Sequence, residues 1–386
     1  MINSPSVLII IPYYLPGYKS GGPTRSISSI VDSCGNDFSF SIITRDRDSG
    51  DKNPYESVNV NSINRVGKAK VLYANDKLLT ISGLYRSMSN LKSDVIYLNS
   101  FFDPVFTLVP LVLNALFFNR FVVLCPRGEF SPGALSIKAL KKKFYIRTFK
   151  FFGLHKKIIW QATTKEEAGF IRCIFGDEVK VKLAMNISLP SIVTKPFSPK
   201  SRVLKVSFLS RVSHKKNVLG ALKALSKVSS RVSFDIYGPS SRPEDKSYLR
   251  ECQAYAKSLP DNIDVKFKGE ICHESVGETL EDYDLFFLPT LGENFGHAIL
   301  EALAAGLPLL ISNTTPWNDL EDKSVGWEAE PTDTVRFAEC IEKFASMSDD
   351  QHIKMRLASL QYAKDYLASS EAVAQTKIMF TEVTKT

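Results

Sequence analysis

Short apolar runs alternate with longer mixed segments through the first 162 residues of the chain. Runs of this length, bounded by Pro, Gly or charged residues, are typical of strands buried on both faces of a sheet. The segments between them are expected to be helices, for example Asp76–Leu91. Such alternation predicts a doubly wound parallel sheet. The expected strands are Val7–Ile11, Phe38–Thr44, Lys70–Tyr73, Val95–Leu98, Phe121–Leu124 and Lys157–Ala162.

The clearest single unit of the pattern lies between residues 284 and 318. Leu285–Leu288 suits a buried strand, and Leu309–Ser312 suits the next one. Between them, Gly296–Ala305 is rich in Ala and Leu and is expected to form a helix that ends at the glycine after it. A strand, a crossover helix and a second strand this close in sequence form a parallel, right-handed unit.

The length of 386 residues is too great for one ordinary hydrophobic core and predicts two domains. Three prolines between Pro190 and Pro199 mark a linker. We therefore expect domains at residues 1–189 and 203–367, joined by residues 190–202. The last segment, 368–386, is amphipathic.

The composition is that of a soluble globular protein, with 44% apolar and 23% charged residues. The six cysteines are scattered without a C-x-x-C motif, which favours reduced thiols and argues against a zinc site. The start of the chain lacks the pattern of a signal peptide. The longest apolar run, Val105–Phe118, is short of the roughly 20 residues that span a bilayer, and we expect it to be a buried helix. These features predict a cytoplasmic protein. The net charge of +8 predicts an anionic partner: a nucleotide, a membrane surface or a nucleic acid.

Candidate chemistry lies in the loop and helix start of the 284–318 unit. Glu293 follows a strand, at the edge where open α/β sheets bind ligands. Asn294, Phe295 and Gly296 are expected to begin the helix, and their free N–H groups suit binding of a diphosphate or a sugar hydroxyl. Glu301 lies about two helical turns further on and could hold hydroxyls of the same elongated ligand. The spacing of the two carboxylates alone is equally compatible with solvated side chains.

The full segment, E-N-F-G-H-A-I-L-E-A-L-A-A-G-L-P, resembles the Glu-x7-Glu signature of retaining glycosyltransferases of family four. The resemblance implies an α/β protein of the GT-B fold, with two Rossmann-like doubly wound domains facing across a cleft. It implies that Glu293 contacts the transferred sugar and that Glu301 holds the ribose of the nucleotide. It also implies that the final helix, 368–386, packs back on the first domain.

Two cations are predicted to bind the donor diphosphate. Arg211 and Lys216 follow the expected strand Val203–Leu209, and two positive charges there can neutralise a diphosphate. The family that the chain resembles has Arg and Lys at this separation in contact with the donor phosphates. Lys215 is the competing residue for the lysine role, and an exposed basic loop is the structural alternative.

A Gly-Gly pair follows the first expected strand. Gly21 and Gly22 precede Pro23, which is well placed at the first position of a helix. A G-x-G-x-x-G motif is absent, so an NAD site is disfavoured. Members of the resembled family often have a Gly-Gly pair here, near the donor phosphates and the acceptor. A flexible loop is the alternative explanation.

After the strand that ends near Cys125, the chain reads P-R-G-E. Arg127 is a candidate for binding a phosphate or a polar acceptor, and Glu129 for accepting a hydroxyl proton. The Pro-Arg-Gly sequence resembles a bacterial surface-polysaccharide subset of the family. A loop-stabilising ion pair explains the same residues.

The segment Lys138–Lys157 interleaves basic and aromatic residues, which fits a helix at an anionic membrane surface. The alternative is a helix with its aromatic side chains in the core and its lysines in solvent. Nucleic-acid binding is disfavoured because no nucleic-acid motif accompanies the segment.

Two D-x-D strings, at residues 46–48 and 282–284, resemble the metal site of GT-A glycosyltransferases, but both lie where a structural role is expected. Arg211, Lys216 and the helix start would supply the positive charge instead, so no metal and no cofactor is expected.

Together these features predict a retaining glycosyltransferase with a UDP- or GDP-sugar donor. The expected acceptor is a glycan or an undecaprenyl-linked glycan, in bacterial O-antigen, lipopolysaccharide or capsule biosynthesis, with the enzyme peripheral on the inner face of the plasma membrane. A nucleotide-sugar epimerase or isomerase on a related fold and a non-catalytic nucleotide-sugar binder remain the alternatives.

Overall fold

The computed structural model describes residues 4–136, 138–195, 197 and 202–385, and it divides into two compact units. The first unit is Met1–Ile187 together with Glu371–Thr386, and the second is Ser188–Ser370. The segment that we expected to be a linker, 190–202, belongs to the second unit, where the N–H of Val193 donates to the carbonyl of Ala304 at 3.0 Å. Residues 196 and 198–201 of that segment lie outside the described residues.

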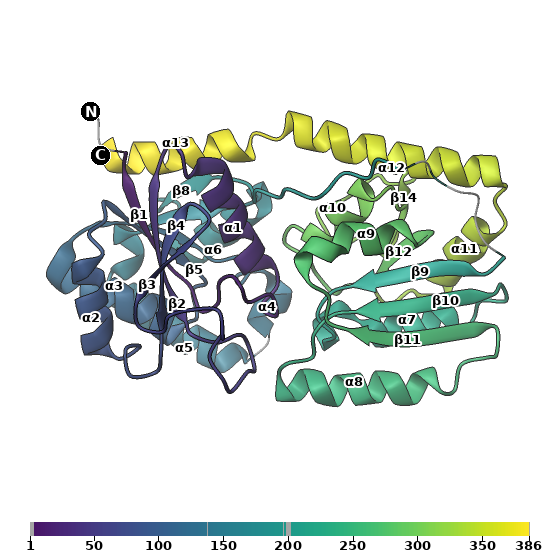
Figure 1. Cartoon of the computed structure of the whole chain (residues 1–386), viewed down its shortest axis with the longest axis horizontal. Helices are drawn as coiled ribbons and strands as arrows, with labels where there is room; N and C mark the ends of the chain where they lie inside the picture. The colour runs from purple at the N-terminus through teal and green to yellow at the C-terminus, as the bar shows by residue number, and fades with distance from the viewer. Residues whose placement is uncertain (1–3, 137, 196, 198–201, 386) are drawn as a thin grey trace. The chain divides into compact units, whose positions relative to one another are not determined.

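The first unit is built on one eight-stranded sheet in the order β3-β4-β2-β1-β5-β6-β7-β8 (Figure 1). Neighbouring strands are parallel except for the pair β3 and β4. Its strands are β1 Ser6–Ile10, β2 Ser39–Arg45, β3 Ile63–Val66, β4 Ala69–Ala74, β5 Val95–Asn99, β6 Phe121–Cys125, β7 Ile159–Ala162 and β8 Lys180–Leu183. Its helices are α1 Gly22–Cys34, α2 Ile81–Asn90, α3 Val109–Leu113, α4 Pro132–Ser136, α5 Ala139–Phe151, α6 Lys165–Phe175 and α13 Ala372–Lys385, with short helices η1 Pro104–Leu108, η2 Asn114–Phe118 and η3 Leu154–Lys157.

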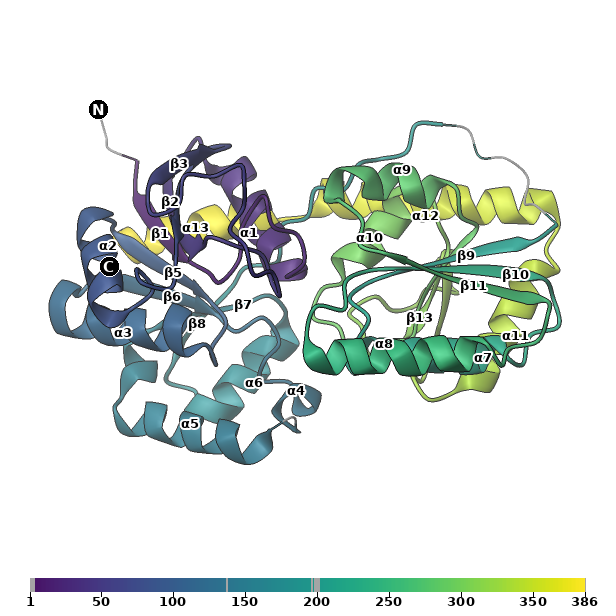
Figure 2. The same ribbon diagram turned by 60° about the horizontal axis from the view of Figure 1, so that its bottom comes forward.

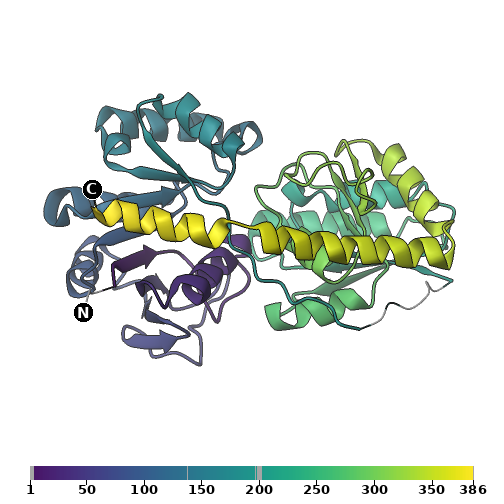
Figure 3. The same cartoon turned by 90° about the horizontal axis from the view of Figure 1, so that it is seen from above.

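Helices cover both faces of this sheet because successive residues of its inner strands point to opposite sides and both sides are apolar. Val7 and Ile9 of β1 join a core with α1 and α13, to which α13 contributes Met379 and Phe380. Leu8 of β1 points the other way, into a core formed with α2, α3, α5 and α6. The C-terminal helix α13 lies beside α1 (Figure 3).

The second unit is built on a six-stranded parallel sheet in the order β11-β10-β9-β12-β13-β14. Helices α7, α8 and α11 lie on one face, and α9, α10 and α12 lie on the other (Figure 2). The strands are β9 Leu204–Leu209, β10 Val232–Tyr237, β11 Ile263–Gly269, β12 Leu285–Leu288, β13 Leu309–Ser312 and β14 Gly326–Ala329. The helices are α7 Val218–Leu225, α8 Pro243–Ala256, α9 Val276–Glu281, α10 His297–Ala304, α11 Thr334–Ala345 and α12 Asp349–Ser369, with short helices η4 His214–Lys216 and η5 His273–Ser275.

The doubly wound α/β architecture predicted from the apolar pattern is confirmed, and each strand expected in the first unit is present within two residues of its predicted ends. Helix α2 begins at Ile81 instead of Asp76, because the hydroxyl of Thr80 caps it by accepting from the N–H of Gly83.

The apolar run Val105–Phe118 was expected to be one buried helix, and this was wrong in two respects. It consists of α3 flanked by the π-helical turns η1 and η2. Its outer side is exposed: 68% of Leu116 and 61% of Phe117 are accessible to solvent. Within the described ranges, no helix is both long and apolar enough to cross a membrane.

Candidate active site

The candidate site of the second unit forms where β9 and β12 end. These strands are distant in sequence but adjacent in the sheet, with Leu285 paired to Val206. Parallel neighbours end at the same edge, so the loops that follow them meet. Two hydrogen bonds join the loops: the carbonyl of Lys215 accepts from the N–H of Leu291 at 2.8 Å and from the hydroxyl of Thr290 at 3.1 Å.

Lys216 and Glu293 form an ion pair and a hydrogen bond across these two loops. Only 13% of the lysine side chain and 17% of the glutamate side chain are exposed. Burial by itself would raise the pKa of the Glu293 carboxyl, but the charge and hydrogen bond of Lys216, helped by the charge of Lys215, hold that pKa below its ordinary value. Glu293 is therefore ionised at neutral pH and can accept hydrogen bonds from hydroxyl groups.

Asn217 ties the site together, and the sequence analysis did not single it out. It has a left-handed backbone (φ 58°), and its side-chain oxygen caps α7 by accepting from the N–H of Gly220 at 3.2 Å. Its side-chain nitrogen donates to the carbonyls of Pro289 and Pro331, each at 3.0 Å. An Asn directly before a helix is the one signal in the sequence that points to this cap.

Arg211 follows the end of β9, at the same edge of the sheet, and has both basic and acidic side chains around it. Its Nε is 3.8 Å from a carboxylate oxygen of Asp245. The pKa of Arg211 is lowered, mainly by burial and then by the charge of the neighbouring Arg242. The charges of Asp245 and Glu293 act in the opposite direction and do not cancel this effect. Arg242, which the sequence analysis missed, adds a further positive charge beside the site.

The start of α10 is held by a tight turn. Gly296 has a φ of 84°, and a β-carbon there would lie 2.7 Å from the side chain of Ile299. The carbonyl of Phe295 accepts from the indole N–H of Trp317 at 2.6 Å. The N–H of Asn294 donates to the carboxylate of Glu293 at 3.3 Å. The turn therefore requires glycine at position 296 and places Glu293 against the helix start.

Glu301 lies inside α10 and is 5% exposed. The Nδ1 atom of His273, in η5 after β11, is 3.5 Å from its Oε1 atom. The alternative that Glu301 is a solvated helix residue is thus excluded, because its side chain is buried. The histidine is a second residue that the sequence did not reveal, since it comes from a different strand of the sheet.

The edge of the second unit thus carries cations from the loop after β9 and carboxylates from the loop and helix after β12. Cations so placed can balance the charge of a diphosphate, and carboxyl oxygens can accept hydrogen bonds from hydroxyl groups. The arrangement suits a ligand that combines a diphosphate with polyhydroxylated ends.

In the first unit, Gly22 is the first residue of α1 and Gly21 is the N-cap residue before it. Gly21 has a φ of 76°, which favours glycine, and Pro23 is in the first turn of the helix. The carboxylate of Asp48 fixes the preceding loop by accepting from the N–H groups of Tyr18, at 2.8 Å, and Lys19, at 3.1 Å. The loop is therefore braced by its own hydrogen bonds and is not a free glycine-rich segment.

Arg127 is engaged within the first unit. Its guanidinium donates to Asn99, at 2.7 and 3.1 Å, to the hydroxyl of Tyr97, at 3.1 Å, and to Asn186. These contacts brace the loop after β6, which has a φ of 54° at Arg127. Glu129 accepts from Ser100 and from the N–H of Phe101, and burial raises its pKa. The expected roles of Arg127 and Glu129 toward an acceptor stay predictions.

Both D-x-D strings have carboxylates that hold backbone or side-chain groups. Asp48 binds the loop as above, Asp46 accepts from Arg47, and Asp284 accepts from the N–H of Lys205 at 2.9 Å. Among the residues that the structure describes, no cluster of three His, Cys, Asp or Glu has the geometry to hold a metal ion.

Comparison with known proteins gives one match to a family model and several solved structures with a similar fold. The model of the family "Glycosyl transferases group 1" matches residues 193–364. No sequence match was found among curated proteins. Sucrose-phosphate synthase from Thermosynechococcus elongatus is similar in structure, with a TM-score of 0.74 and 14% identity over 98% of this chain and 99% of that one.

Two further solved structures have the same fold. HepE from Anabaena, in complex with UDP-glucose, has a TM-score of 0.71 and 14% identity, over 98% of this chain and 99% of that one. The E. coli structure described as trehalose-6-phosphate bound with UDP-2-fluoro glucose has a TM-score of 0.66 and 10% identity, over 99% of each chain. The chain has the GT-B fold of these glycosyltransferases, as the signature segment predicted.

Proposed function

We propose that this chain, whose residues 193–364 match the model of the glycosyl transferases group 1 family, is a retaining enzyme that transfers a sugar from a nucleoside-diphosphate sugar to an acceptor hydroxyl. The observation that carries the proposal is the pairing of Lys216 with Glu293, with Arg211 beside them. The leaving group is a nucleoside diphosphate, so stabilising its developing negative charge is the main catalytic task.

Each residue then has a separate role. Arg211 and Lys216 hold the diphosphate, and the N–H groups at the start of α10 contribute to the same charge stabilisation. Glu293, ionised because its pKa is low, accepts hydrogen bonds from hydroxyls of the transferred sugar. Glu301 accepts from the ribose. Gly21 and Gly22 of the first unit are assigned to the donor phosphates and Arg127 to the acceptor side.

We assign the donor as a UDP- or GDP-sugar. Two of the proteins with this fold have been solved with a uridine nucleotide sugar, which supports UDP as the first nucleotide to test. Positive charge from protein side chains replaces a metal in this assignment. Its support is that Arg242 and Glu293 both act on the charge of Arg211, and that Lys216 pairs with Glu293.

We propose a glycan or undecaprenyl-linked glycan as the acceptor, in bacterial O-antigen, lipopolysaccharide or capsule biosynthesis, with the enzyme peripheral on the inner face of the plasma membrane. Support comes from the basic, aromatic segment at residues 138–157. The name of one similar structure, sucrose-phosphate synthase, brings a competing acceptor, a soluble sugar phosphate.

The test has two stages. A panel of UDP- and GDP-sugars is first screened for thermal stabilisation of the protein, and each stabilising donor is then assayed for release of nucleoside diphosphate with lipid-linked glycans, free glycans or sugar phosphates. We expect release that depends on the acceptor. Glu293→Gln should retain affinity for the bare nucleotide and lose turnover. Conversion of the donor without any acceptor would instead identify an epimerase, and binding without consumption under every acceptor would identify a non-catalytic binder.

A further inference from the structure

Helix α5 is apolar on two opposite sides. On the inner side, Phe149 is buried and Tyr145 packs against the core of the first unit. On the outer side, Leu140, Phe144 and Phe151 are 84%, 74% and 84% exposed. A helix on the surface of a sheet normally places polar residues outward, so packing within the unit explains only the inner side.

The three outer residues form one stripe. Positions four and seven apart lie on the same side of an α-helix, and Leu140, Phe144 and Phe151 have these spacings. Phe152 follows at the end of the helix and is 67% exposed. Exposed apolar side chains that occur singly need no explanation, but an aligned stripe of this size marks an interaction surface. We call Leu140, Phe144 and Phe151 the outer stripe of α5.

Positive charge flanks the outer stripe. Lys141, Lys143 and Arg147 are exposed, and the sequence has no Asp or Glu between Glu129 and Glu166. Lys142 differs from its neighbours: its ammonium donates to the carbonyl of Ala134 at 2.6 Å and lies 4.9 Å from the ring centre of Phe102. The cations beside the stripe therefore face outward without carboxylates on the same segment to neutralise them.

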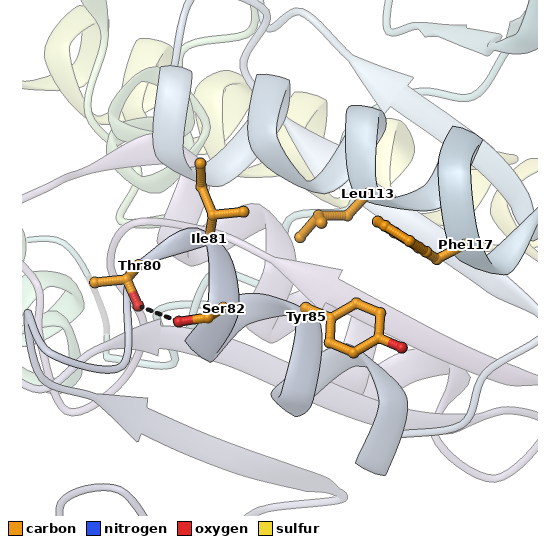
Figure 4. Close-up of a pocket in the computed structure, with 6 residues that line it drawn as sticks. All are labelled: Thr80, Ile81, Ser82, Tyr85, Leu113 and Phe117. Atoms are coloured by element: carbon orange, nitrogen blue, oxygen red, sulfur yellow. Dashed lines mark hydrogen bonds between the residues drawn. The ribbon is translucent and has the colours of Figure 1, made fainter.

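A second exposed apolar area lies on the same layer of helices. Helices α2, α3 and α5 all pack against the same face of the sheet. Between α2 and η2 is an open hollow of about 770 Å³ (Figure 4). It is lined by Thr80, Ile81, Ser82, Tyr85, Leu113 and Phe117. Leu116, next to the hollow in sequence, is also exposed. The apolar surface of this layer thus extends beyond α5.

We propose that the outer stripe of α5 docks the first unit on an anionic lipid surface, with Leu140, Phe144 and Phe151 inserted at the boundary of headgroups and acyl chains and Lys141, Lys143 and Arg147 on the lipid phosphates. The apolar side chains match the acyl-chain boundary of such a surface, and the basic side chains beside them match its anionic headgroups. Apolar burial and attraction to anionic lipid then act together. The inference deepens the proposed function, and rests on it in one respect: a lipid-linked acceptor is presented at that same surface.

The experiment measures binding of the full-length protein to vesicles of phosphatidylglycerol and phosphatidylethanolamine by co-sedimentation, with phosphatidylcholine vesicles for comparison. The wild-type protein is expected to bind the anionic vesicles at low salt and to release at high salt, because salt screens exposed charges. The double variant Phe144→Ser/Phe151→Ser should weaken binding by about tenfold or more, since each ring loses its burial. Lys141→Ser/Lys143→Ser should weaken it by about 30-fold at low salt.

Matched controls come from exposed residues of the same unit that lie off this helix. Ile63→Ser removes a half-exposed apolar side chain of β3, and Lys52→Ser/Lys70→Ser removes two exposed lysines. These controls should bind vesicles as the wild type does. All variants should keep the nucleotide affinity and melting temperature of the wild type, because the changed side chains are exposed and none of them is assigned to nucleotide binding.

The proposal is overturned if the wild-type protein ignores anionic vesicles at low salt, or if the stripe and lysine variants bind as tightly as the controls. It is also overturned if gel filtration shows a dimer that the stripe variants dissociate, since the stripe is then an interface between copies of the chain. If the wild-type protein transfers sugar but does not bind anionic vesicles, the docking proposal is wrong and the proposed function stands. If vesicle binding depends on the outer stripe of α5 but no sugar transfer is found, the proposed function is wrong and the docking proposal stands.

Discussion

Lys216 and Glu293 form an ion pair although 77 residues separate them in the sequence. The lysine follows β9 and the glutamate follows β12, and the sheet places these two strands side by side. The residue assigned to the donor diphosphate and the residue assigned to the transferred sugar therefore touch, and the lysine helps to hold the pKa of the Glu293 carboxyl below its ordinary value.

Replacing Lys216 by Met should change both the rate and its pH dependence. The catalytic constant should fall by about 100- to 1000-fold, because a positive charge that stabilises the leaving diphosphate is lost. Burial of Glu293 remains while its main cationic partner is gone, so the pKa of Glu293 should rise. The acid limb of the pH–rate profile should then move to higher pH. Lys227→Met, an exposed lysine of the same unit, serves as the control.

The same substitution has a signature in stability. The pKa of Glu293 is depressed in the folded protein, so the ion pair stabilises the fold above the ordinary pKa of 4.5, and this contribution is lost as the pH falls through the folded-state value. Urea unfolding should show wild type and variant converging in stability as the pH falls below 4.5. A constant difference at all pH values would contradict the ion pair.

Glu301→Ala should weaken nucleotide binding by about 1–3 kcal/mol, the scale of a hydrogen bond to a charged group. The bare nucleoside diphosphate should show the loss as clearly as the full donor, because the ribose is common to both. Calorimetry measures it, with the exposed Glu278→Ala of the adjacent helix α9 as control. An unchanged dissociation constant would remove the ribose role from Glu301.

Asn217→Gly tests the tether between the loops. Glycine accepts the positive φ, so the variant removes only the side-chain hydrogen bonds to Pro289, Pro331 and the helix start. We expect the free energy of unfolding to fall by about 1–3 kcal/mol. Asn119→Gly is the matched control, since Asn119 also has a positive φ but is exposed. Equal stability of the two variants would show that the tether contributes nothing.

Treatment with EDTA should leave sugar transfer unchanged. Three carboxylates of the D-x-D strings, those of Asp46, Asp48 and Asp284, bind groups of the protein, and the positive charge at the donor diphosphate is assigned to side chains. The measurement is the rate of nucleotide release before and after chelation, with Mn²⁺ added back. Activity lost on chelation and restored by Mn²⁺ would overturn the metal-free assignment.

The sequence predicted those parts of the site that lie within one strand–loop–helix segment. Glu293, the turn at Gly296 and the helix that carries Glu301 follow from the apolar run and the glycine, and they fall within α10 and the loop before it. The pairing with Lys216 needed the order of strands, which sequence periodicity does not supply. For the same reason His273, after β11, and Arg242, after β10, were not foreseen beside the site.

In the first unit, the sequence pattern did not show which aromatic side chains of the segment Lys138–Lys157 are buried, because this depends on how the helix packs. The basic, aromatic segment could have had its rings in the core or at a surface, and the structure has both: Phe149 is buried and Phe144 is exposed. Arg127 was predicted to bind a ligand because it is a basic residue after a strand. In the structure its guanidinium donates hydrogen bonds to Asn99, Tyr97 and Asn186, and its role toward an acceptor stays a prediction.

The stereochemistry of the product tests the account most directly. With a donor and an acceptor that support nucleotide release, proton NMR of the product reports the anomeric configuration of the new linkage through its coupling constant. A retaining enzyme predicts an α-linked product from an α-configured donor, formed by the wild-type protein and not by Glu293→Gln. A β-linked product from the same donor, or conversion of the donor with no linkage formed, would contradict it.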